Sequence, residues 1–138
     1  MRPRVTVITL GVDDLERAVT FYRDGLGWET PGIVGSDDHG AVAFFPLEGG
    51  VTLALWRRSS LARDAGLPLS PASPTELSLG CNVHAPDEVD AAWAKAIAAG
   101  ATPVKPPGPT FWGGYAAYVQ DPDGHLWEQV HNPDLLPG

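Results

Sequence analysis

The sequence predicts an α+β fold, in which a single domain of 138 residues contains two similar modules. Two observations predict it. Short runs rich in β-branched and aromatic residues alternate with two amphipathic helical segments. When the helices are aligned with Leu15 on Val89, their apolar positions match, and each helix follows a strand. A proline-rich connector at residues 67–75 separates module 1, at residues 1–66, from module 2, at residues 76–138.

The first module is expected to begin with a β-branched strand at residues 5–10. Asp13 and Glu16 have the spacing of a capping box, which predicts the start of a helix. Apolar residues then recur on one helical face, at Leu15, Ala18, Val19, Tyr22 and Leu26. Two strands and a helical turn are expected to follow, at residues 41–45, 51–56 and 59–65.

The second module is expected to open with a strand at residues 77–83. Pro86 suits the first position of a helix, and Asp87 and Glu88 are favourable near the positive end of its dipole. The apolar face of this helix comprises Val89, Ala92, Trp93, Ala96 and Ile97. Three strands follow, at residues 101–105, 111–120 and 125–131, and the last two flank the tight turn Asp121-Pro122-Asp123-Gly124. One strand of the two modules is short or divided.

Charge and composition argue against several classes of function. The net charge is −8 and the only adjacent basic pair is Arg57-Arg58, so the clustered cations that nucleic acids and anionic membranes require are missing. No apolar run approaches the roughly 20 residues of a membrane span, and the amino terminus lacks a signal-peptide pattern. The single cysteine, Cys81, fits a reducing compartment and packs as a small apolar residue. We therefore expect a cytoplasmic protein.

Two motifs resemble those of a known family. The first is VDDLERAVTFYRDGLGW at residues 12–28, and the second is YVQDPDGHLWEQVHNP at residues 118–133. Together they resemble the opening and closing segments of the vicinal-oxygen-chelate superfamily, which includes glyoxalase I, extradiol dioxygenases, fosfomycin-resistance enzymes and bleomycin-binding proteins. The resemblance implies two βαβββ modules whose sheets curl around a shared cavity, and a homodimer. It leaves the activity open, because one scaffold hosts lyases, isomerases, oxygenases and sequestering proteins.

The enzymes of this superfamily use a divalent metal, and the resemblance gives the positions of its ligands. Here those positions hold Val7, Ala54, Ser78 and Glu128. Only Glu128 is an ordinary ligand for such a metal, whereas a catalytic site needs about three protein ligands. The four histidines fall in turns or at strand ends, at His39, His84, His125 and His131. We therefore expect no metal and no other cofactor, with a divalent metal recruited across a dimer as the alternative.

Small and polar residues replace the missing ligands on the predicted cavity faces. Strand alternation places Ser78 and Asn82 on one face of the fifth strand and Thr9 on the cavity face of the first. Such a surface leaves volume for an organic ligand, and the alternative is a solvated sheet face. The segment Phe111-Trp112-Gly113-Gly114-Tyr115, together with Trp56, supplies aromatic rings that could stack on a ligand or anchor a dimer interface.

These residues lead to a functional hypothesis. Glu128 has three interpretations: part of a polar network, a partner for a cationic ligand, or a general base with a raised pKa. We expect a metal-independent protein that sequesters an aromatic or amphipathic natural product or antibiotic, with an enzyme acting through Glu128 or a recruited metal as the alternative, and a structural or interaction module as a third. The expected ligand-binding residues are Thr9, Trp56, Ser78, Asn82, Phe111, Trp112, Tyr115 and Glu128.

Overall fold

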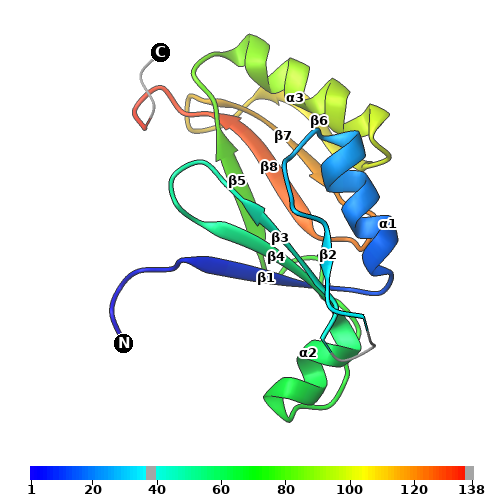
Figure 1. Ribbon diagram of the computed structural model, residues 1–138. Coiled ribbons are helices and arrows are strands. Elements are labelled where there is room, and N and C mark those ends of the chain that lie inside the picture. The colour runs from blue at the N-terminus through cyan, green and yellow to red at the C-terminus, as the bar shows by residue number, and fades with distance from the viewer. Residues whose placement is uncertain (37–39, 136–138) are drawn as a thin grey trace. The chain divides into compact units, whose positions relative to one another are not determined.

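The computed structural model describes residues 1–36 and 40–135 of the chain, so His39 lies outside the described residues. It divides into two compact units, Met1–Pro71 and Ala72–Gly138. Each unit contains one four-stranded sheet, and both repeat the order strand, helix, strand, strand, strand (Figure 1). The α+β class and the repeated modules predicted from the sequence are thereby confirmed.

The sheet of the first unit has the strand order β1-β4-β3-β2. Strand β1 (Val7–Val12) lies parallel to β4 (Thr52–Arg57), and β3 (Val42–Pro46) pairs with β4 in the antiparallel sense. Strand β2 (Ile33–Val34) has two residues, which is too short for a hydrophobic pattern to predict. It is the short strand that the sequence did not locate.

The first helix begins one residue later than its sequence pattern predicts. Helix α1 (Leu15–Val19) has Asp14 as its N-cap, and the Asp14 carboxylate accepts a hydrogen bond from the Arg17 amide at 3.0 Å. The expected capping box of Asp13 and Glu16 is therefore wrong, because Asp13 is instead engaged by the Arg58 guanidinium. The chain continues as a π-helical segment, η1 (Thr20–Gly25).

The core of the first unit contains the predicted apolar face. Leu15, Ala18 and Tyr22 are at most 2% exposed, and they belong to the same buried set as the alternate residues Leu53 and Leu55 of β4. Helix α2 (Arg58–Ala65) follows β4 directly and ends at Gly66, which has a φ of 73°. This left-handed conformation favours glycine, so the residue ends the helix without strain.

The sheet of the second unit has the order β5-β8-β7-β6. Strand β5 (Ser78–Asn82) is parallel to β8 (Leu126–His131), and β7 (Tyr115–Gln120) is antiparallel to β8. The edge strand β6 (Thr102–Pro109) is longer than predicted and pairs with β7 through two register shifts. The strand expected at residues 111–120 begins only at Tyr115, because residues 111–114 form a turn.

Helix α3 (Pro86–Ala98) lies along one face of this sheet and contacts β6, β7 and β8 (Figure 1). Pro86 occupies the first turn, as predicted. The Glu88 carboxylate accepts hydrogen bonds from the amides of His84 and Ala85 at 2.7 and 2.9 Å, which satisfies donors that the helix start leaves free.

Strand alternation divides the second sheet into a core face and an open face. Ala117 and Val119 of β7 and Trp127 and Gln129 of β8 are buried on the core face. The Tyr115 hydroxyl donates a hydrogen bond to Asp90 of α3 at 2.8 Å, which shows that this face of β7 is turned toward the helix. Intervening residues therefore lie on the opposite face, which positions the candidate site described below.

The turn between β7 and β8 is held by a buried carboxylate. Asp121 is 2% exposed and accepts hydrogen bonds from the amides of Asp123 and His125, at 2.9 and 2.8 Å. Its second oxygen lies 2.9 Å from Nδ1 of the His125 ring. Gly124 follows with a φ of 87°. The sequence predicted this turn, and the structure shows that Asp121 is the residue that fixes it.

We expect Asp121→Ala to reduce the free energy of unfolding by about 2–4 kcal/mol, because two backbone donors and an imidazole lose a buried acceptor. Urea denaturation followed by circular dichroism measures this change. The exposed carboxylate of Asp134 provides the control, and Asp134→Ala should have little effect. Equal effects of the two substitutions would contradict the role assigned to Asp121.

Candidate functional site

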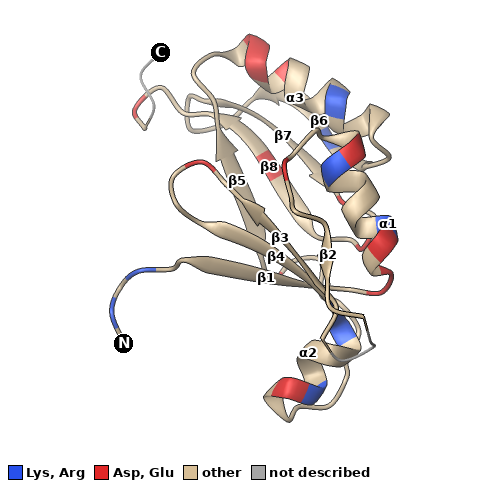
Figure 2. Cartoon of the chain, viewed as in Figure 1, with Lys and Arg blue, Asp and Glu red and all other residues tan. Residues whose placement is uncertain are grey.

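A small pocket lies on the open face of the second sheet. Its volume is about 100 Å³, and it is lined by the side chains and backbone of three consecutive strands and one turn. Ala116 and Tyr118 come from β7, and Glu128 comes from β8. Strand β8 is uncharged except at Glu128, which is its one acidic position in Figure 2. The remaining lining residues are Lys105, Gly108, Thr110, Phe111 and Trp112.

The wall formed by Phe111 and Trp112 belongs to a tightly hydrogen-bonded turn. The Thr110 amide donates to the Gly114 carbonyl at 2.9 Å, and the Gly114 amide donates to the Thr110 hydroxyl oxygen at 2.8 Å. Gly113 has a φ of 96°, which favours glycine. Phe111 is fully exposed and Trp112 is 43% exposed. The turn therefore presents two aromatic side chains beside the polar floor of the pocket.

Tyr118 and Glu128 form the polar floor. They are direct partners across the β7–β8 ladder. Burial raises the pKa of the Tyr118 phenol above its ordinary value of 10.0, and its hydrogen bond to the Glu128 carboxylate raises that pKa further. The Tyr118 phenol is the donor in this hydrogen bond, and the Glu128 carboxylate is the acceptor.

The structure brings together three of the residues that the sequence predicted for the ligand site. Phe111, Trp112 and Glu128 all line the pocket. Ser78 and Asn82 lie on β5 two residues to either side of Gly80, the partner of Glu128, so they share its face but do not line the pocket. Thr9 and Trp56 share a face of the first sheet, where Thr9 is exposed and Trp56 half-buried.

Tyr115 is separated from the pocket. It was expected to act with Trp112, but its hydroxyl is bonded to Asp90 of α3, on the core face of the sheet. The expectation treated Phe111, Trp112 and Tyr115 as one aromatic segment. Tyr115 is instead the first residue of β7, and alternation along this strand places it with Ala117 and directs Ala116 and Tyr118 toward the pocket.

Sequence reasoning missed Lys105, Thr110 and Tyr118 as site residues. Tyr118 could have been predicted, because a hairpin around the turn at residues 121–124 places it opposite Glu128 in the neighbouring strand. Lys105 could not, since the register shifts of β6 on both sides of it make its face unpredictable.

Comparison with known proteins places the fold in a family. The model of the Glyoxalase/Bleomycin resistance protein/Dioxygenase superfamily matches residues 4–129. The chain belongs to this superfamily. No protein of curated function matches the sequence. None of the helices in the described part of the chain has the length and apolar character needed to span a membrane.

Solved structures from the superfamily are similar along almost the whole chain. A glyoxalase-related enzyme from Fulvimarina pelagi is 36% identical with a TM-score of 0.81, over 96% of this chain and 90% of that one. A glyoxalase/bleomycin resistance protein/dioxygenase from Nocardioides is 28% identical with a TM-score of 0.77, over 100% and 89% of the two chains. A hypothetical protein from S. aureus is 25% identical with a TM-score of 0.78, over 96% and 95%.

The residues at the superfamily's metal positions do not form a ligand set in this chain. Gly80, rather than Ser78, stands beside Glu128 in the β5–β8 ladder, and glycine has no side chain to coordinate a metal. In the first sheet Ala54 pairs with Thr9, and Val7 pairs with Thr52. Within residues 1–36 and 40–135, no three His, Cys, Asp or Glu side chains form a group that could hold a metal ion. Glu128 remains the single carboxylate donor at these positions.

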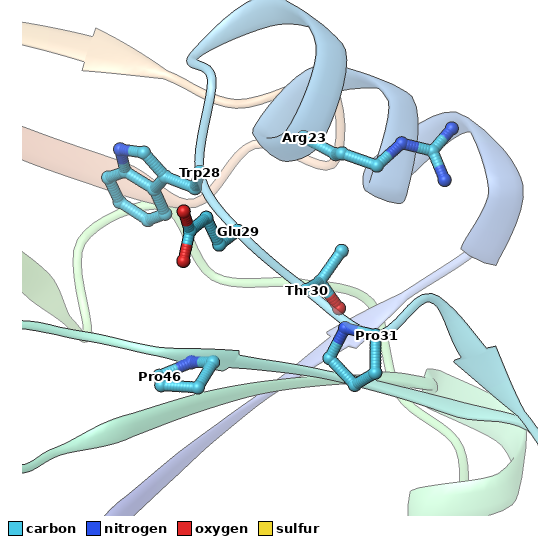
Figure 3. Close-up of a pocket in the computed structure, with 6 residues that line it drawn as sticks. All are labelled: Arg23, Trp28, Glu29, Thr30, Pro31 and Pro46. Atoms are coloured by element: carbon cyan, nitrogen blue, oxygen red, sulfur yellow. The ribbon is translucent and has the colours of Figure 1, made fainter.

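A larger groove lies in the first unit, but two of the polar side chains that line it already form hydrogen bonds within the protein. It has a volume of about 540 Å³ and is lined by residues that include Arg23, Trp28, Glu29 and Thr30 (Figure 3). The Arg23 guanidinium points away from Trp28 and donates to both carboxylate oxygens of Asp24, at 2.9 and 3.1 Å. The Thr30 hydroxyl donates to the Phe44 carbonyl and accepts from the Gly32 amide. Two of its polar groups are thus already engaged by the protein.

We expect Glu128→Gln to lower the pKa of Tyr118, although the value should stay above 10.0 because burial is the larger cause of the shift. Since the pKa is raised in the folded state, the stabilisation by this pair is complete below pH 10.0 and is lost as the pH rises through the raised value. Ultraviolet absorbance of the phenolate, compared with Tyr118→Phe, isolates this titration.

The second paired tyrosine provides the control for this titration. Its hydrogen bond to Asp90 raises the pKa of Tyr115, so Asp90→Asn should lower the pKa of Tyr115 and leave that of Tyr118 unchanged. A Tyr118 titration that is identical in wild type and Glu128→Gln would refute the assigned pair.

Proposed function

We propose that this member of the superfamily is a metal-independent binding protein for a flat aromatic or amphipathic small molecule, which it sequesters and releases unchanged. The observation that carries the proposal is the composition of the second-unit pocket: one hydrogen-bonded carboxylate, Glu128, next to an exposed aromatic wall. A structural or interaction module would not need these groups to converge.

The aromatic wall supports an aromatic ligand. Phe111 is fully exposed and Trp112 is 43% exposed, so much of their ring surface is free to be covered. Aromatic pairs contribute about 0.5–1.5 kcal/mol beyond the burial of their area. The pocket itself is small, at about 100 Å³, so it would take one ring or polar group while the rest of the ligand extends along the wall.

The polar floor sets the chemistry at the end of the ligand. Glu128 accepts a hydrogen bond from Tyr118, and a carboxylate has further lone pairs for a ligand N–H or an ammonium group. Lys105 lines the same pocket and could meet a carbonyl or an anionic group. A ligand that carries a cationic amine next to an aromatic ring satisfies both the wall and the floor.

Lys105 also favours a second candidate, an enzyme that uses Glu128 as a base. A base needs a cation or donor that stabilises the developing negative charge, and Lys105 and Tyr118 both line the pocket that contains Glu128. The two candidates differ in one outcome, because a binding protein returns its ligand intact whereas an enzyme converts it.

We expect a flat cationic dye such as proflavine to quench tryptophan fluorescence and to be recovered unchanged. Glu128→Gln should weaken its binding about tenfold or more, since a charge-assisted hydrogen bond contributes about 1.5–3 kcal/mol. Trp112→Phe should reduce the quenching, whereas Trp93→Phe, on α3, should not. Retention of full affinity by Glu128→Gln would rule out the proposed polar contact, and turnover of a bound compound that Glu128→Gln abolishes would favour the enzyme.

We expect the purified protein to bind proflavine equally well before and after treatment with EDTA, because the superfamily's metal positions supply one carboxylate donor and no second ligand beside it. Elemental analysis per mole of chain accompanies the titration. A divalent metal near one per chain, together with loss of binding on chelation, would overturn the metal-independent function.

A further inference from the structure

We propose that Gly114 is a positioning residue that seats the indole of Trp112 over the pocket, and that this fixed indole makes the pocket selective for flat aromatic ligands. The selectivity rests on the binding function proposed above. The seat itself is a property of the unliganded protein, so it can be measured without a ligand.

The contact between Trp112 and Gly114 depends on the absence of a side chain. A Cβ atom added to Gly114 would overlap the Cη2 and Cζ3 atoms of the Trp112 ring and would lie 2.8 Å from the carbonyl oxygen of His131. The benzene edge of the indole therefore rests directly on the Gly114 backbone. Any other residue at this position would displace the ring.

Space, rather than backbone freedom, explains this glycine. Gly114 is not among the residues with positive φ, whereas its neighbour Gly113 has a φ of 96°. The pair thus has two separate functions: Gly113 allows the chain to turn, and Gly114 leaves room for the indole. Alanine could adopt the backbone conformation of Gly114 but not its contact with Trp112.

Hydrogen bonds fix the backbone on both sides of Gly114. Thr110 and Gly114 exchange two hydrogen bonds across the turn, at 2.9 and 2.8 Å. Tyr115, the next residue, is bonded to Asp90 of α3 at 2.8 Å. The backbone under the ring is therefore fixed from both directions, and the indole is held before any ligand arrives.

A fixed indole has a direct consequence for recognition. Ordering a mobile side chain on binding has an entropic cost, and a ring that is already in place avoids that cost. The benefit is largest for a ligand with a flat face, because only such a ligand covers the indole without moving it. A compact aliphatic cation meets the same carboxylate but covers less of the indole, so it gains less from the fixed ring, through cation–π attraction alone.

The first test observes the seat by nuclear magnetic resonance. A protein labelled with nitrogen-15 should show an indole N–H signal for each of its five tryptophans, and Trp112→Phe identifies that of Trp112. We expect Gly114→Ala to shift the Trp112 signal. Gly108→Ala adds the same methyl group within the same pocket lining, where nothing lies within 4 Å of the new atom, and should leave the Trp112 signal in place. If the chemical shift of the Trp112 indole N–H were the same in Gly114→Ala as in the wild type, the proposed contact between the ring and Gly114 would be wrong.

The second test separates the indole from the neighbouring strand. Because the added Cβ also approaches the His131 carbonyl oxygen, Gly114→Ala is expected to lower the denaturation midpoint for two reasons. A double-mutant cycle with Trp112→Ala removes the contribution of the ring. We expect Gly114→Ala to cause a smaller loss in the Trp112→Ala background than in the wild type. Equal losses in both backgrounds would show that the ring does not rest on Gly114.

The third test concerns selectivity, with proflavine as the flat cation and tetraethylammonium as the compact one. We expect Gly114→Ala to weaken the binding of proflavine about tenfold, as loss of an aromatic contact of about 1.4 kcal/mol implies, and to weaken the binding of tetraethylammonium by a smaller factor, because its cation–π contact covers less of the ring. Equal weakening of both cations would contradict the selectivity. If the wild type does not bind proflavine, both the proposed binding function and its selectivity are wrong. The first two tests would still show whether the Trp112 indole rests on Gly114.

Discussion

The buried carboxylate of Asp121 is the interaction on which the site of the second unit depends. It fixes the turn between β7 and β8 through the amides of Asp123 and His125, and the turn sets the register of the two strands. That register places Tyr118 opposite Glu128 and Ala117 opposite Gln129, so one pair reaches the pocket and the other reaches the core. A slip of one residue would exchange these faces, because side chains alternate along a strand. The turn held by the buried Asp121 thus determines which side chains line the pocket.

The two faces of the second sheet differ in their surroundings: one packs in the core, and the other lines the pocket. Residues directed toward α3 are buried and largely apolar, and Tyr115 is tied to the helix by Asp90. The other face holds Tyr118 and Glu128 as well as the buried Ala116 and Val130, and the turn at residues 110–114 adds aromatic rings beside them. Because one scaffold can host many functions, membership of the superfamily does not set the function, which must be argued from side chains such as those on this face. In this chain the open face offers the Trp112 indole and the Glu128 carboxylate, which accepts a hydrogen bond from Tyr118.

The sequence predicted the elements with long periodic patterns and the residues that depend on them. Helix α3 and its start at Pro86 agree with the prediction, and Leu15, Ala18 and Tyr22 of the predicted apolar face are buried. Tyr115 was expected to act with Trp112 because the two are close in one aromatic segment, whereas Trp112 belongs to the turn and Tyr115 to the core face of β7. The seat of Trp112 could not be predicted, because it depends on the direction of a side chain and not on a pattern. Gly80 beside Glu128 likewise required the register of two strands that lie far apart in the sequence.

The edge strand β6 restricts how this unit can associate. Four of its eight residues are prolines, which have no amide hydrogen to donate, and its register shifts make the edge irregular. Another strand therefore cannot readily add to the sheet along β6. Fibrous stacking is blocked there, and a protein that joins this unit at β6 must do so through side chains. The edge next to the pocket is consequently protected from strand addition by the backbone itself.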